Sequence, residues 1–337
     1  MVKYSLSLHD TVPIFEVIGA PDLDADGFFR KDIVDPERKG LITEILAREN
    51  DKMKYAMDRA VGIYTEGTVY SARAFGDIRS LEETDGRSLL KAYDKMIRKG
   101  AVVAAIAGRY DRDLTDRVTE MLSGIFEGNA PEKEIIPGRF PHNYRRRKDL
   151  VVMKEIKDVE QAKICLICED VRSSYSAQDS CNVLLNEILG GDVDSLLFKV
   201  VREELALAYS VFSFNIASMN ALVMMAGIDG KNLAKAAGAM TGQLERIKEG
   251  NYPDRIIESA KTSLRSTLLQ SSDTLKEMLS DGMSSLHKSR YVNNLDLIDE
   301  IERITKADIC TRAAKFETAV DFSIVSKKRK KQTSRPD

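Results

Sequence analysis

Arg202 and Tyr209 are the residues of this 337-residue chain whose types and spacing best suit a chemical role. A guanidinium and a phenol are both hydrogen-bond donors that can be aimed at a carbonyl oxygen as it gains negative charge. The plainer interpretation makes Arg202 a solvated partner of Glu203 or Glu204, and Tyr209 an ordinary strand aromatic. The residue types alone leave both interpretations open.

The surrounding sequence predicts the elements that position this pair. A first helix has an apolar face at helical spacing and ends at Gly190-Gly191, where we expect a left-handed cap; its face consists of Cys181, Leu184, Leu185 and Ile188. A second helix has a predicted buried stripe of Leu196, Leu197, Val200 and Val201. Alternation from Leu207 to Ser213 predicts a strand. Arg202 therefore falls near a helix end and Tyr209 at a strand start.

This stretch resembles the insulinase, pitrilysin and mitochondrial-processing-peptidase family of zinc peptidases. The shared string is a leucine-rich helix ending in Gly-Gly, then Ser-x-Leu-Phe, then an arginine followed seven positions later by the tyrosine of Leu-Ala-Tyr-Ser-Val. In that family the arginine and tyrosine belong to the second of two similar domains and face the zinc site of the first. The resemblance implies that Arg202 and Tyr209 contact the carbonyl and oxyanion of a peptide substrate.

The family's inverted zinc motif, His-x-x-Glu-His, does not occur in this sequence. A catalytic zinc needs about three protein ligands and an activated water, with a carboxylate to take that water's proton. The histidines are His9, His142 and His287, and none is followed at the required spacing by Glu-His. Glu44 falls where the family places its distal zinc-binding glutamate; without the motif we expect an exposed or capping helix residue. We expect zinc only if a partner or a missing N-terminal segment supplies it.

The cysteines predict packing rather than metal binding. Cys165 and Cys168 form a C-x-x-C pattern, but they lie in an alternating run, where residues three apart point to opposite faces of a sheet. We expect buried, small hydrophobic side chains. Four cysteines in the whole chain, with Cys181 and Cys310, are typical of a reducing compartment.

Composition predicts a cytoplasmic protein that binds neither nucleic acid nor membrane. The net charge is −2, and the only basic concentration near an end is the tail that begins at Lys327, which we expect to be disordered. The first ten residues contain no apolar signal region, and the longest apolar run, residues 101–107, is too short to cross a bilayer.

The predicted fold is α+β, with two related α/β-sandwich units of the insulinase type, each an antiparallel-rich sheet with helices on one face. Ile78, Leu81 and Leu89 recur as Ile298, Ile301 and Ile309 at an offset of 220, which indicates an internal repeat. A buried strand at 101–107 would then correspond to the strand from Ala319. We expect an N-terminal domain at 1–127, incomplete at its N-terminus, a linker at 128–148, a C-terminal domain at 149–326 and a basic tail at 327–337.

Three functions are compatible with these residues. The leading hypothesis is a non-catalytic subunit that supplies Arg202 and Tyr209 to a zinc-bearing insulinase-like chain as a heterodimer, with self-association as another form of pairing. The second is a fragment of an active zinc endopeptidase whose zinc motif lies upstream of Met1. The third is a peptide-binding or scaffolding module.

Overall fold

The computed structural model describes residues 18–72, 75–100, 102–109, 112–128, 149–170, 180–216, 219, 221–271, 274–285 and 293–326. His9, His142, His287, nearly all of the predicted linker and the basic tail lie outside these ranges. The described chain separates into two compact units, one within residues 1–47 and 73–136 and one within 48–72 and 137–337. Each unit is described by itself.

The first unit is helical. Its helices are α2 (Lys31–Asn50, whose last turn extends into the second unit), α4 (Ile78–Glu82), α5 (Gly86–Lys99) and α6 (Arg112–Ile125). Asp85 caps α5 by accepting a hydrogen bond from the Ser88 backbone N–H. The rings of Phe29 and Tyr93 meet edge to face at 5.7 Å and hold the preceding loop against α5.

The predicted buried strand at 101–107 is wrong for the residues that the structure describes there. Residues 102–107 have no regular secondary structure, and Val102, Val103 and Ile106 are exposed. A strand needs a neighbour for its backbone N–H and C=O groups. The described part of the first unit offers only an isolated bridge between Leu23 and Phe29.

The second unit is built on one five-stranded sheet with the order β1-β5-β2-β4-β3. The strands are β1 (Val151–Lys157), β2 (Ala162–Asp170), β3 (Ala208–Ile216), β4 (Ala221–Ile228) and β5 (Phe316–Ser326). β1 is parallel to β5 and the other neighbours are antiparallel, with Cys165 opposite both Phe322 and Met225. The predicted α+β class is confirmed.

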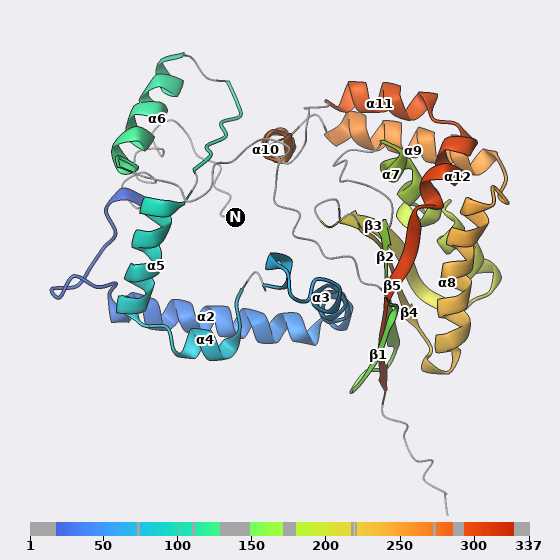
Figure 1. Ribbon diagram of the computed structural model, residues 1–337, viewed down its shortest axis with the longest axis horizontal. Helices are drawn as coiled ribbons and strands as arrows, with labels where there is room; N and C mark the ends of the chain where they lie inside the picture. Colours follow the sequence, from blue (N-terminus) through green and yellow to red (C-terminus); the bar gives the residue numbers. More distant parts are fainter. Residues whose placement is uncertain are drawn as a thin grey trace, which may run out of the picture. The chain divides into compact units, whose positions relative to one another are not determined.

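Most helices of the second unit cover one face of this sheet (Figure 1). They are α7 (Ser180–Asn186), α8 (Leu233–Lys248), α9 (Arg255–Ser271), α11 (Asn294–Arg303) and α12 (Lys306–Ala313), with α10 (Leu275–Ser285) and the short 3₁₀ turns η1 (Val69–Ser71) and η5 (Gly230–Asn232) between elements. A buried ion pair joins α12 to β2, because Arg312 Nη1 lies 2.5 Å from Asp170 Oδ2. This layer and the inner residues of β2 and β4 form the larger core.

Helix α3 (Lys52–Tyr64) covers the opposite face of the sheet (Figure 1). Ala56, Ala60 and Tyr64 follow one another at helical spacing and are buried against β2 and β5. The small alanines let the helix approach closely, and the Tyr64 hydroxyl donates to the Met219 carbonyl at 3.2 Å. Residues 52–64 fall within the predicted 1–127 domain, whereas the observed compact units group them with the second unit.

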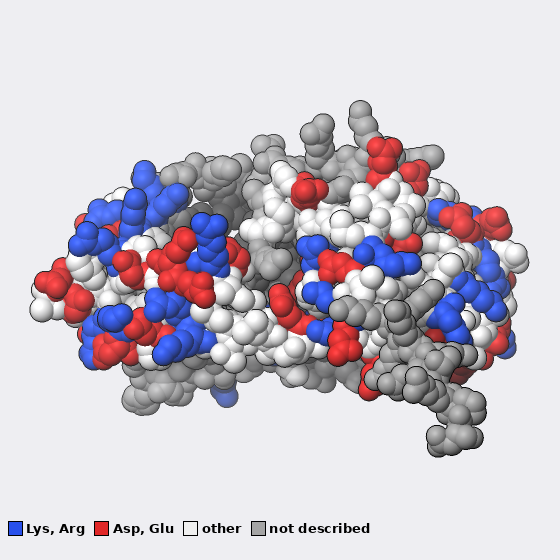
Figure 2. Space-filling view, turned by 90° about the horizontal axis from the view of Figure 1, so that it is seen from below, with Lys and Arg blue, Asp and Glu red and all other residues white. Residues whose placement is uncertain are grey.

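Charged side chains of both signs are interspersed on the face of the molecule shown in Figure 2. In the part of the chain that the structure describes, no helix combines the length and the apolar character needed to cross a bilayer.

Candidate functional site

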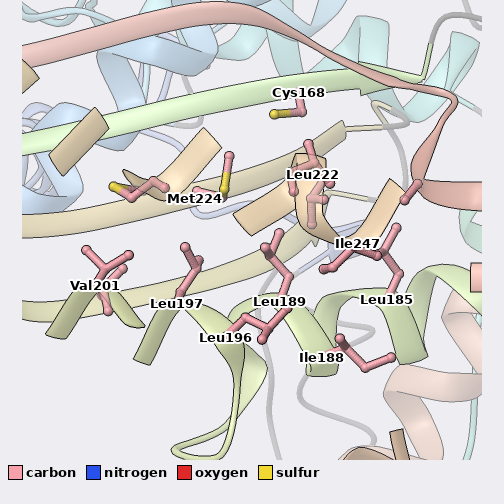
Figure 3. Close-up of a cluster of buried hydrophobic side chains, with 14 of the residues drawn as sticks. Cys168, Leu185, Ile188, Leu189, Leu196, Leu197, Val201, Leu222, Met224 and Ile247 are labelled. Atoms are coloured by element: carbon pink, nitrogen blue, oxygen red, sulfur yellow. The ribbon is translucent and has the colours of Figure 1, made fainter. Parts of the chain in front are cut away.

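The segment that carries Arg202 and Tyr209 is held in place by the larger core. Two wide π-helical turns, η2 (Glu187–Gly191) and η3 (Leu197–Glu204), follow α7 where the sequence predicted ordinary helix. Leu189, Leu197 and Val201 point toward the strand that carries Leu222 and Met224 (Figure 3), and Ile188 and Leu196 are buried in the same core. The predicted stripe is confirmed except at Val200, which is only partly buried.

Gly190 and Gly191 lie where neighbouring atoms come very close to the backbone, and they do not form a left-handed turn. Gly190 has a φ of −163°, so the predicted left-handed cap is wrong. A Cβ at Gly190 would lie 2.7 Å from the backbone nitrogen of Ser213, and one at Gly191 would lie 2.3 Å from Glu187 Oε2. A side chain at position 190 would therefore force η2 away from β3, whereas one at position 191 would displace the Glu187 side chain.

Burial raises the pKa of the Glu187 carboxyl in this segment, while a hydrogen bond from the Ser263 hydroxyl at 2.8 Å partly offsets the effect. The Ser263 contact also ties η2 to α9. Asp194 has a similar anchoring role before η3, since it accepts from Ser259 and pairs with Lys199 at 2.6 Å. These contacts fix the loop from which η3 begins.

Arg202 lies exposed in η3 and stacks on an aromatic ring. Its guanidinium carbon is 4.5 Å from the centre of the Phe198 ring, one turn earlier. Neither Glu203 nor Glu204 forms an ion pair with it, and no other residue that the structure describes does so. The ion pair of the plainer interpretation is therefore not seen, and the N–H donors of the guanidinium keep their capacity to bind another group.

Tyr209 is the extra residue of a β-bulge. Ala208 pairs with Ile228 and Ser210 pairs with Gly227, which leaves Tyr209 without a residue opposite it, and its side chain is 60% exposed. A bulge changes the direction of the strand and re-aims its side chains, and bulges are common beside active sites.

A left-handed residue joins the two site elements. Ala206 has a φ of +49°, a region that non-glycine residues rarely adopt, and it separates η3 from β3. The backbone N–H of Leu205 donates to the Val200 carbonyl and that of Leu207 to the Val201 carbonyl, both at 2.9 Å. These hydrogen bonds span five and six residues, wider than in an α-helix, and they end η3. The structure thus brings both predicted residues to the surface on consecutive elements, without a hydrogen bond between them.

The π-helical turns and the bulge were not predicted from the sequence. One signal could have indicated the bulge: Gly227 interrupts an otherwise apolar strand, and glycine within a strand often marks a bulge or a close approach. A Cβ at Gly227 would lie 3.0 Å from the Ser210 hydroxyl, beside Tyr209. The sequence contains no comparable signal for the π-helical turns.

The described residues do not provide a zinc site. They contain no group of three or more His, Cys, Asp or Glu side chains that could hold a metal ion. Glu44 is exposed on α2. Cys165 and Cys168 are buried on opposite faces of β2, as predicted, and burial raises the pKa of both thiols, that of Cys168 to about 11. Protonated, buried thiols are poor metal ligands.

Comparison with known proteins identifies relatives that share this architecture. The chain is 26% identical over 312 residues to a protein of Bacillus subtilis named "Probable inactive metalloprotease YmfF", covering 90% of this chain and 69% of the relative. It is 24% identical over 296 residues to another B. subtilis protein, "Uncharacterized zinc protease YmxG", covering 85% and 69%.

Two solved structures show the same fold. A conserved protein from Enterococcus faecalis V583 superposes with a TM-score of 0.78 at 21% identity, covering 94% of this chain and 74% of that chain. A peptidase M16 inactive domain from Pseudomonas fluorescens superposes with a TM-score of 0.73 at 17% identity, covering 94% and 75%. The family described as "Peptidase M16 inactive domain" matches residues 86–264, more than half of the sequence. The chain belongs to the peptidase M16 family, whose inactive domain it carries.

Proposed function

We propose that this protein is a non-catalytic M16 subunit that presents Arg202 and Tyr209 to a peptide bound at the zinc site of a separate M16 chain. The observation that carries the proposal is the placement of both side chains. Each is exposed, and each is set at an irregular point of the backbone, the end of a π-helical turn or a β-bulge. Irregular backbone of this kind is concentrated at functional sites.

The chemistry expected of the pair is the stabilisation of charge on a carbonyl oxygen. Arg202 offers a guanidinium that lies over the Phe198 ring and makes no ion pair with any described residue. Tyr209 offers a phenolic hydroxyl. Donors that are already in position cost little reorganisation when an oxyanion forms, which is why such groups contribute strongly to catalysis.

The metal and its activated water would come from the other chain. This division is supported by the lack of a suitable ligand group among the described residues and by the name of the B. subtilis relative, which describes that protein as a probable inactive metalloprotease. The pair contacts substrate, so this chain would affect turnover without holding the zinc.

Copurification tests the proposal. Tagged full chain isolated from its native source is expected to carry a companion of the M16 family that has the His-x-x-Glu-His motif. The complex of the two chains is expected to cleave peptides with zinc bound at the companion's motif, whereas this chain alone holds no zinc and neither purified chain cleaves peptides alone. One zinc held by this chain alone, with peptide turnover, would contradict the proposal.

Site variants in the reconstituted pair give the sharper test. Arg202→Ala and Tyr209→Phe are each expected to lower kcat by about 100- to 1000-fold, the usual effect of removing an oxyanion donor, without releasing the companion. Arg303→Ala is the matched control, because Arg303 is an exposed arginine at the end of α11. Full activity of the Arg202 variant would show that this chain does not contribute to substrate binding in the way proposed.

A further inference from the structure

Neighbouring strands of the second unit bring polar side chains together beside Tyr209. Gly227 of β4 lies opposite Lys163 of β2 on one side and opposite Ser210 of β3 on the other. Residues directly opposite each other share a face of the sheet, so the side chains of Lys163 and Ser210 lie on the same face. This is the face that α3 covers, because Ile324, the other neighbour of Lys163, belongs to the core beneath α3. Ser210 follows Tyr209 directly in the chain.

The missing side chain of Gly227 leaves room that these polar groups surround. A Cβ at this position would lie 3.0 Å from Ser210 Oγ, 3.1 Å from Lys163 Nζ and 3.4 Å from Gln161 Oε1. The Lys163 ammonium also donates a hydrogen bond to Gln161 Oε1 at 3.2 Å. An ammonium has more N–H donors than this one bond uses, and the serine hydroxyl can donate as well. Donors from two strands therefore converge on one point of the sheet.

Lys163 differs from the other lysine at this end of the sheet in having no carboxylate partner. It is partly buried, and it forms no ion pair with any residue that the structure describes. Burial lowers the pKa of its ammonium, and the charge of Asp51, which lies beyond ion-pair distance, offsets part of the effect. Lys231, just beyond the end of β4, instead pairs with Asp229 at 3.0 Å. A partly desolvated ammonium with donors to spare favours an anionic ligand.

We propose that Lys163 and Ser210 form a subsite that binds a carboxylate of the peptide contacted by Tyr209. The ammonium supplies the opposite charge and the hydroxyl a second donor, so a carboxylate is preferred to an uncharged amide of the same shape. An acidic side chain and the C-terminus of a peptide both offer this group. The inference rests on the proposed function, because that function brings the peptide to Tyr209.

Peptide binding to the full chain alone tests the subsite without a companion. The probes are acetyl-Ala-Ala-Glu-Ala-Ala-amide, the same peptide with Gln in place of Glu, and an acetylated alanine pentapeptide with a free C-terminal carboxylate. Binding is followed by the NMR signals of isotope-labelled lysine side chains, among which that of Lys163 is identified by its loss in Lys163→Met.

The Glu peptide is expected to shift the Lys163 signal and to bind about fivefold more tightly than the Gln peptide, as for one partly exposed charged contact. A preference for the alanine peptide over both would support the subsite and assign the carboxylate to the C-terminus. Equal binding of all the peptides, or no shift of the Lys163 signal at millimolar peptide, would overturn the proposal.

Substitutions locate the preference within the cluster. Lys163→Met is expected to abolish the preference for Glu over Gln, Lys163→Arg to retain it, and Ser210→Ala to reduce it about twofold. The matched control is Lys231→Met, which removes the lysine already paired with Asp229 and should change the preference less than about twofold. Unchanged hydrogen exchange at β2 and β5 shows that each variant is folded. An equal loss in the control would overturn the assignment to Lys163.

The reconstituted pair separates this subsite from the proposed function. If turnover does not depend on Arg202 and Tyr209 while the Glu peptide still binds this chain through Lys163, the proposed function fails and the carboxylate subsite stands. If Arg202→Ala lowers turnover while Lys163→Met leaves the ratio of kcat/KM for the Glu and Gln peptides unchanged, the subsite fails and the proposed function stands.

Discussion

At the scale of single residues, the contact between Arg202 and Phe198 holds the guanidinium without using its hydrogen-bond donors. The guanidinium carbon lies over the Phe198 ring, 4.5 Å from its centre, and the guanidinium makes no ion pair with any described residue. A long side chain at a surface normally samples many rotamers, and restricting it costs entropy when it binds a ligand. If Arg202 binds a ligand as proposed, Phe198 would reduce this cost in advance and act as a positioning residue.

Phe198→Leu is expected to lower kcat/KM of the reconstituted pair by about two- to fivefold, which corresponds to roughly 0.5–1 kcal/mol for an exposed cation–π contact. Phe198→Tyr keeps the ring and should retain the parent rate. Peptide cleavage is measured for Phe198→Leu in the parent and in the Arg202→Ala background. Phe198→Leu should have no further effect in the second background, because the guanidinium is gone. An equal loss in both backgrounds would mean that Phe198 acts on the core instead.

At the scale of elements, a polar network attaches α3 to the edge strand β1. Glu155 of β1 accepts hydrogen bonds from the Tyr55 hydroxyl at 2.8 Å and from Arg59 Nε at 2.7 Å. Lys157 lies 4.7 Å from the centre of the Tyr55 ring. Burial alone would raise the pKa of the Glu155 carboxyl, but the bonds from Arg59 and Tyr55 outweigh it, and the pKa is lowered from 4.5.

The lowered pKa of Glu155 predicts that this attachment weakens in acid. A carboxyl whose folded-state pKa is lowered stabilises the fold above its unfolded pKa of 4.5, and the contribution disappears as the pH falls through the folded value. Glu155→Gln should lower the free energy of unfolding by about 1 kcal/mol at pH 7, a figure reduced for partial exposure, and by progressively less as the pH falls below the unfolded pKa of 4.5.

Denaturant unfolding of the parent and the Glu155 variant, at pH 7 and at a pH below 4.5, checks this prediction. The control is Glu160→Gln, since Glu160 is exposed just after β1. A loss that is the same at both pH values would show that the carboxylate charge does not contribute to the attachment of α3.

The elements differ in how far the sequence predicts them. β3 and β5 begin within a few residues of the predicted positions, Leu207 and Ala319, because their apolar periodicity is set by the core that they form. The placement of α3 was not predictable from its own residues: Ala56 and Ala60 mark an apolar face without stating which sheet it covers. Residues 102–107 show the converse, since their strand pattern is only realised when a neighbouring strand is present.

The candidate site shows the same contrast. Arg202 and Tyr209 were predicted from their spacing within a family string, whereas the π-helical turns and the bulge around them depend on packing of η2 and η3 against β3. A close approach such as that of Gly190 to Ser213 depends on residues far apart in the sequence.

At the scale of the whole molecule, the two units differ in how much apolar surface they bury. The second unit has a sheet with a core on each face, while the first buries few apolar side chains among its described residues. Stability is therefore expected to be uneven along the chain, since regions with little buried apolar surface open at low free-energy cost.

Native-state hydrogen exchange of the full chain alone should show this difference. After correction for intrinsic rates, amides of β2, β4 and β5 are expected to exchange at least about 100-fold more slowly than those of α5, because they need global rather than local opening. Both regions are measured in the same sample, so each serves as the reference for the other. Equal protection would mean that the first unit folds with the second in one cooperative step.

The opposite orientations of Cys165 and Cys168 give the sheet two separate chemical reporters. Cys165 lies beneath α3 and Cys168 beneath the layer that contains α8, and neither thiol is accessible until its own cover lifts. A thiol-specific label that modifies Cys165 first would record the detachment of α3, whereas one that modifies Cys168 first would record loosening of the opposite layer. The order in which the two faces of this sheet come apart can thus be followed with the protein's own cysteines.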